Sequence, residues 1–142
     1  MNNIDFGSLL FGFDGRINRA KYWLAVAIYF VVTLIAMGLM FALHGMIGMV
    51  LMGIIYVVMI VSGIAVGIKR LHDCDKSGWW LLVFYLVPGL LSAAAVNMDD
   101  SLILNLLSFA VSIWGLVQLG FLRGTIGPNR FGPDPIPGAA PA

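Results

Sequence analysis

The sequence predicts an all-α integral membrane protein, a bundle of four transmembrane helices with both termini in the cytoplasm. Of its 142 residues, 61% are hydrophobic and only 11% are charged, against roughly 25% charged residues in a soluble domain. The apolar residues fall into long runs, and every Lys and Arg lies outside those runs. Too little polar surface remains to cover a water-soluble globule, so we expect a single membrane domain over residues 1–142.

Residues 1–21 are expected to form a lead on the membrane surface. Its apolar positions follow the period of one helix face, at Phe6, Leu9, Leu10 and Phe13. Asp5 is predicted to cap this short helix, and Asp14 to cap the helix that follows. We interpret the lead as an interfacial helix; the alternative is a helix that binds a partner.

The first two spans are predicted in one run, Tyr22 to Ile68, which contains no Asp, Glu, Lys or Arg. A run of this length holds about two spans of 20 residues. His44 is the polar residue near its middle, so we expect helices at about 22–43 and 46–68, with His44 in the turn. A ligand or proton-relay role for His44 is the alternative. Gly63 and Gly67 have the spacing of a close helix contact, either within the chain or between two copies.

The third and fourth spans are predicted at about 79–96 and 101–122. The third contains Pro88, which removes one backbone hydrogen bond from the helix. The residues from 123 to 142 are rich in Pro and Gly and are expected to form a cytoplasmic tail.

The basic residues give the orientation. All eight lie in the lead, in the segment between the second and third helices, or in the tail: Arg16, Arg19, Lys21, Lys69, Arg70, Lys76, Arg123 and Arg130. The two other turns carry none, so the positive-inside rule places both termini in the cytoplasm. Aromatic residues that anchor helices at the membrane interface are expected at Tyr22, Trp23, Trp79 and Trp80.

Polar residues of the three basic segments are expected to meet at the cytoplasmic face. The candidate site residues are Arg16, Arg19, Arg70, His72, Asp73, Asp75, Asn129 and Asp134. On a continued second helix, Lys69 and Arg70 lie one turn from Asp73, which can also meet Arg16 or Arg19 across the bundle. One interpretation is a structural clasp; the other is a binding site for an anion or a partner.

Neither a metal site nor a cofactor is expected. His72, Asp73, Cys74 and Asp75 are adjacent, and consecutive helix residues point in different directions, so one ion would recruit two of them at most. The single cysteine excludes an internal disulfide.

The three segments together resemble a family of small bacterial inner-membrane proteins called domain of unknown function 805. The residues that carry the resemblance are Gly15, Arg16, Arg19, Tyr22, Trp23, Arg70, His72, Asp73, Ser77, Gly78, Trp79, Trp80, Pro88, Gly127, Asn129, Phe131, Gly132, Asp134 and Pro135. Members commonly have Tyr where this chain has Phe131. The resemblance implies four membrane helices and an inner-membrane location, and it implies no established activity.

The sequence therefore predicts a non-enzymatic inner-membrane protein whose basic cytoplasmic face binds an anionic lipid headgroup, a small anion or a protein partner. One alternative is a small transporter or channel subunit that acts as an oligomer; another is a membrane enzyme that uses His72, Asp73 and Asp75. The expected partners are the lipid bilayer, an anionic lipid, and a second copy or another membrane protein. Nucleic acid is not an expected partner.

Overall fold

The computed structural model describes residues 4–43 and 45–136, and it is all-helical apart from turns and one isolated β-bridge, Asn129 to Gly132. The elements in order are α1 (Phe6–Phe11), α2 (Arg19–Leu43), α3 (Gly45–Asp73), α4 (Trp80–Val96), α5 (Leu102–Leu116) and the π-helical turn η1 (Val117–Phe121). The turn expected at His44 lies outside the described residues.

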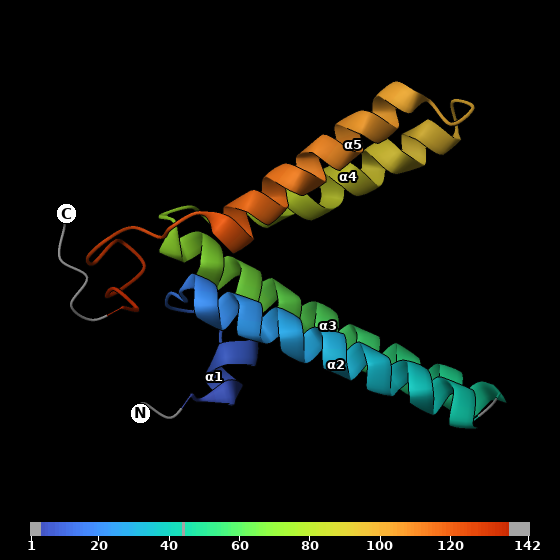
Figure 1. Ribbon diagram of the computed structural model, residues 1–142, viewed down its shortest axis with the longest axis horizontal. Helices are drawn as coiled ribbons and strands as arrows, with labels where there is room; N and C mark the ends of the chain where they lie inside the picture. The colour runs from blue at the N-terminus through green and yellow to red at the C-terminus, as the bar shows by residue number, and fades with distance from the viewer. Residues whose placement is uncertain (1–3, 44, 137–142) are drawn as a thin grey trace.

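The four long helices form two antiparallel hairpins (Figure 1). Helix α2 packs along α3, and α4 packs along α5, and the two hairpins meet at one end and diverge toward the other. The predicted all-helical bundle is therefore built from two helix pairs that contact each other at one end. Lipid tails are as apolar as leucine, so apolar helices gain no hydrophobic free energy by packing along their whole length.

Among the described residues, three helices are long and apolar enough to cross a membrane: Arg19–Leu43, Gly45–Asp73 and Leu102–Phe121, the last of which is α5 continued by η1. Helix α4 is apolar but has only 17 residues, which is about 26 Å of helix against a hydrocarbon core of about 30 Å. Helix α3 continues to Asp73, past the apolar run that ends at Ile68. The apolar run gives the length of helix that can lie in the hydrocarbon core. The helix continues beyond it to Asp73, whose backbone carbonyl accepts the N–H of Thr125.

The helix starts agree in part with the capping predictions. The Asp5 side chain caps α1 by accepting the backbone N–H groups of Gly7 and Ser8, as predicted. Asp14 does not cap α2. The cap is Asn18, whose Oδ1 accepts the backbone N–H of Lys21 at 2.9 Å.

Of the two glycines at helix-packing spacing, Gly67 makes a close contact with another helix and Gly63 makes none with the described residues. A Cβ atom there would lie 2.8 Å from Cδ2 of Leu81 in α4, so the two hairpins approach each other through this glycine. At Gly63 a Cβ atom would meet nothing within 4 Å. The hairpins have already begun to separate at that position.

Candidate functional site

Three helices end at the place where the hairpins meet, which we call the junction. These are α1, α3 and α5 with its extension η1 (Figure 1). The last four carbonyl groups of a helix have no partner within it, and together they carry a partial negative charge. The terminal carbonyls of these three helices therefore need hydrogen-bond donors from elsewhere in the chain. The basic residues lie in the segments that form the junction and can supply those donors.

Arg70 joins α3 to the end of the second hairpin. Its side chain is completely buried. Its Nε donates to the carbonyl of Leu119 at 2.7 Å, one terminal nitrogen donates to the carbonyl of Leu122, and the other donates to Oδ2 of Asp73 at 2.7 Å. The predicted pair of Arg70 and Asp73, one turn apart, is therefore present and holds η1 against α3.

Arg16 joins the segment before α2 to α3 and to the tail. Its Nε and one terminal nitrogen donate to Oδ1 of Asp73 at 3.2 and 3.1 Å. The terminal nitrogens also donate to the carbonyls of Thr125 at 2.6 Å and Gly127 at 2.8 Å. Of the two arginines predicted to reach Asp73, the structure selects Arg16. Arg19 instead donates to the carbonyl of Phe121 at 3.1 Å.

Asp73 is the centre of this buried ion-pair cluster, which consists of Arg16, Asp73 and Arg70. Both of its carboxylate oxygens accept from arginine, and its backbone carbonyl accepts from the N–H and hydroxyl of Thr125 at 2.8 and 3.1 Å. The tail passes so close that a Cβ atom at Gly124 would lie 2.0 Å from Oδ2 of Asp73. Glycine is the only residue that fits there.

The tail is held to the junction by Asn129 and Asp134. The Asn129 amide donates to the carbonyl of His72 and to the hydroxyl of Thr125, both at 2.8 Å. Asp134 accepts the backbone N–H groups of Gly127 at 2.8 Å and Ile136 at 2.9 Å. Donation from the Ile136 amide, and then from the Gly127 amide, holds the pKa of the Asp134 carboxyl below its usual range.

His72 and Asp75 point away from the buried cluster. The His72 ring stacks on Phe131, with 3.8 Å between ring centroids, and its Nδ1 lies 3.3 Å from the carbonyl of Gly15. Asp75 is exposed and pairs with Arg130 at 3.2 Å. Burial raises the pKa of the Cys74 thiol between them. In the described parts of the chain, no three His, Cys, Asp or Glu side chains come close enough to hold a metal ion.

Lys69 has a different partner from the one its spacing suggested. It forms no ion pair with Asp73; its Nζ donates to the carbonyls of Ser8 at 2.5 Å and Leu9 at 2.7 Å, at the C-terminal end of α1. The hydroxyl of Ser62 donates to the next carbonyl, Leu10, at 2.8 Å. Helix α3 therefore caps α1 with two side chains and fixes it beside the first hairpin.

The predicted interface anchors lie at the same end of the molecule. Trp23 Nε1 donates to the carbonyl of Gly120 at 3.0 Å, and Trp80 packs edge-on against Trp114, with 5.6 Å between ring centroids. Tyr22 packs against the buried residues of both hairpins. Trp79 is 77% exposed. With Arg70 and Arg19, Trp23 completes a set of donors to the last carbonyls of the second hairpin.

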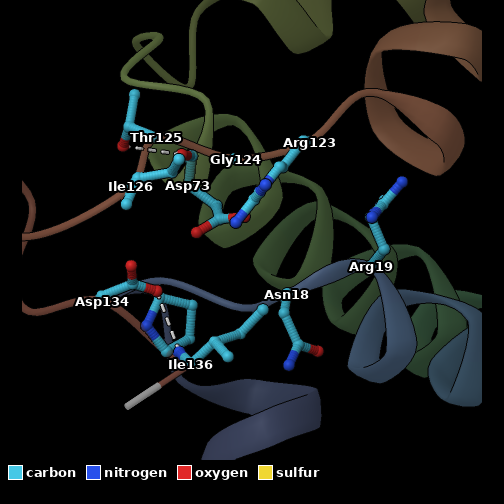
Figure 2. A pocket seen from close by; sticks show the side chains of 10 residues that line it. Asn18, Arg19, Asp73, Arg123, Gly124, Thr125, Ile126, Asp134 and Ile136 are labelled. Carbon is cyan, nitrogen blue, oxygen red and sulfur yellow. Dashed lines mark hydrogen bonds between the residues drawn. The ribbon is translucent and has the colours of Figure 1, made fainter. Parts of the chain in front are cut away.

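Cavities of different character adjoin the junction, and three of them bear on its function. A small one of about 40 Å³ is lined by the start of the first hairpin and by the tail; Figure 2 shows Asn18 and Arg19 on one side of it and Asp134 on the other. An apolar groove of about 870 Å³ lies between α3 and α4, beside Gly63. A third, of about 410 Å³, lies beside α1.

The sequence pattern did not predict that Lys69 caps α1 or that Gly124 and Thr125 contact Asp73. Gly124 follows the apolar run directly and is flanked by Arg123 and Thr125. A glycine beside polar residues at a helix end was the available signal, because such a glycine permits a close approach of the backbone. Nothing in the spacing of Lys69 pointed to α1.

Comparison with known proteins agrees with the resemblance seen in the sequence. Residues 10–133 match the family described as "Protein of unknown function (DUF805)". The chain is 32% identical over 133 residues to "Inner membrane protein YhaH" of Escherichia coli strain K12, a match that covers 87% of each chain. It is 31% identical over 129 residues to "Inner membrane protein YhaI" of the same strain, covering 87% of this chain and 86% of the relative.

A third relative, "Uncharacterized protein YiiR" of the same strain, is 28% identical over 138 residues, covering 88% of this chain and 86% of the relative. No solved structure matches the chain. The family match extends from the end of α1 through the junction segments of the tail. The protein therefore belongs to the DUF805 family and is a multi-pass protein of the bacterial inner membrane.

Proposed function

We propose that the protein is a non-enzymatic membrane protein with four spans and both termini in the cytoplasm, and that its junction binds the headgroup of an anionic lipid. All eight basic residues lie in the segment that leads into α2 and its first turn, at the end of α3 and the loop after it, or in the tail, and this distribution supports the orientation. The short helix α4 is compatible with a span, because bilayer thinning and long flanking side chains accommodate a mismatch of a few ångströms.

The two buried arginines serve as a structural clasp in this proposal. Their donors are bound by Asp73 and by carbonyls of η1, of Leu122 and of the tail. No buried side-chain nitrogen or oxygen in the described part of the chain lacks a hydrogen-bond partner. An anion would have to displace protein groups to reach Arg16 or Arg70. We therefore assign lipid binding to basic side chains that are exposed at the surface of the junction.

Arg19 and Arg123 are the outer cations that fit this role, and their placement is the observation that carries the proposal. Both are exposed and line the small cavity shown in Figure 2. The Arg123 side chain makes no hydrogen bond within the described residues, and Arg19 uses only one of its nitrogens. The adjacent rings of Trp23 and Phe121 lie 5.6 Å apart and are partly exposed, as is typical of residues at headgroup depth.

The expected gain follows from the charge of the two guanidinium groups. A basic residue near an anionic membrane surface contributes about 1 kcal/mol. Two of them contribute about 2 kcal/mol, which is about 30-fold in affinity.

The described contacts of His72, Asp73 and Asp75 do not favour the enzyme alternative that uses these three residues. His72 stacks on Phe131, Asp73 is enclosed by arginines, and Asp75 faces outward toward Arg130. A catalytic set needs side chains that converge on one reacting atom, and these three diverge.

The test compares phosphatidylglycerol binding to the full-length protein in mixed micelles, measured by native mass spectrometry. Arg19→Gln with Arg123→Gln should weaken binding about 30-fold. The matched control is Lys76→Gln with Arg130→Gln, which removes the same charge from side chains that already have protein partners. Equal losses in the two double variants would refute a site at Arg19 and Arg123.

A further inference from the structure

The cavity of about 410 Å³ beside α1 is separate from the site at Arg19 and Arg123. It lies between α1, the segment that leads into α2, and the last turns of α3, with Pro135 of the tail at its edge. Its volume falls within the range of small-molecule sites, about 300–1,000 Å³. Four charged side chains besides Arg16 line it, two of each sign: Asp5, Asp14, Lys21 and Lys69.

Lys69 brings a buried positive charge to this cavity. Lys69 is only 3% exposed. It forms no ion pair in the part of the chain that the structure describes. The ammonium group has three N–H donors, and two of them bind the carbonyls of Ser8 and Leu9. One donor remains, and an anion that accepted from it would offset the cost of burying the ammonium charge.

Lys21 and Asp14 supply free charges of both signs at the same cavity. Neither side chain makes a hydrogen bond or ion pair within the described residues. Asp5, by contrast, is already used as the cap of α1. Arg16 already donates to Asp73 and to the carbonyls of Thr125 and Gly127. A ligand that pairs with Asp14, Lys21 and Lys69 needs an anionic group for the two lysines and a cationic group for the aspartate.

The exposed aromatic residues around α1 support a position of this cavity beside the membrane surface. Three phenylalanines on or next to α1, Phe6, Phe11 and Phe13, are 52%, 48% and 44% exposed. A short helix with exposed aromatic residues lies in the interface, with its apolar side among the acyl chains. Phospholipid headgroups are the charged groups found at that depth.

We propose that this cavity binds a phosphoethanolamine group, with the phosphate on Lys21 and Lys69 and the primary ammonium on Asp14. A primary ammonium donates hydrogen bonds to a carboxylate, which the quaternary ammonium of choline cannot do. Quaternary ammonium groups are recognised by aromatic cages, and no aromatic residue of the described chain lines this cavity. A purely anionic headgroup would leave Asp14 opposite a negative charge.

The test is a competition among phosphatidylethanolamine, phosphatidylcholine and phosphatidylglycerol for the full-length protein in mixed micelles, read by native mass spectrometry. The wild type should prefer phosphatidylethanolamine to phosphatidylcholine about tenfold, the effect of one charge-assisted hydrogen bond. Asp14→Asn should remove that preference, and Lys21→Gln should weaken both lipids alike. Asp99→Asn removes one exposed carboxylate from the turn between α4 and α5, at the opposite end of these helices from the junction, and should leave the preference intact.

A wild type that does not distinguish the two lipids, or an Asp14→Asn protein that still does, would overturn the proposal. Soluble phosphoethanolamine tests the source of the ligand. If it displaces the lipid, the headgroup chemistry alone is sufficient; if it binds with the same dependence on Asp14 but does not displace the lipid, the acyl chains add to the affinity. The Arg19→Gln and Arg123→Gln protein should keep the preference, so this proposal and the proposed function can fail independently.

Discussion

Neutralising Asp73 should destabilise the protein more than any other single loss of charge at the junction. Asp73 places Oδ1 against Arg16 and Oδ2 against Arg70. In Asp73→Asn, one of these oxygens becomes an NH₂ group, so in either orientation of the amide one arginine faces a second donor. Removing one partner from a buried ion pair costs about 3–5 kcal/mol, because the remaining charge stays buried without compensation.

The interaction energy between Asp73 and Arg16 tests the clasp more specifically than the loss of stability in a single variant does. Arg16→Gln by itself removes the charged partner of Oδ1 of Asp73 and should also lower the free energy of unfolding. Once Asp73 is neutral, Arg16 has already lost its charged partner, so the second change should cost less than it does in the wild type. The expected interaction energy is about 1–3 kcal/mol, as for groups in one hydrogen-bonded network.

The measurement is a double-mutant cycle of equilibrium unfolding in mixed micelles, in which sodium dodecyl sulfate is the denaturant. The chain provides its own control in Arg130 and Asp75, a pair whose side chains are 60% and 46% exposed. An exposed pair contributes about 0–1 kcal/mol, so Arg130→Gln with Asp75→Asn should be nearly additive. Additivity of Arg16→Gln and Asp73→Asn to within about 0.5 kcal/mol would refute the clasp.

Two further predictions concern the orientation and the tail. In a background without the native cysteine, a cysteine at Asp99 should react with an impermeant maleimide from the periplasm, and one at Lys76 only after the membrane is opened; identical labelling would mean that α4 does not cross. Asp134 has a lowered pKa in the folded protein, so its hold on the tail should persist above the unfolded value of about 3.9 and weaken as the pH falls through the lowered value. Hydrogen exchange at the Gly127 amide should report this loss, and Asp134→Asn should abolish the pH dependence; a Gly127 amide that is equally protected at all pH values would contradict it.

The sequence was sufficient for the class of protein and for the three segments that carry its basic residues. Charged side chains are costly in the hydrocarbon core of a membrane, so a spanning helix shows as a long apolar run in the sequence. For the same reason all basic residues of this chain are confined to three segments between or beside those runs. The pair of Arg70 and Asp73 was also predictable, because residues three apart on a helix lie on one face. The end of α3 was not predictable from hydropathy alone.

Only the tertiary structure decided which donor meets which acceptor. Arg16 rather than Arg19 reaches Asp73, and Lys69 binds α1 rather than Asp73, because backbone carbonyls at helix ends compete with carboxylates for the same cations. A sequence shows charges but does not show where three helices end together. The separation of the hairpins was equally hidden: lipid fills the space between apolar helices as readily as another helix does, so an apolar run specifies a span without specifying its neighbour.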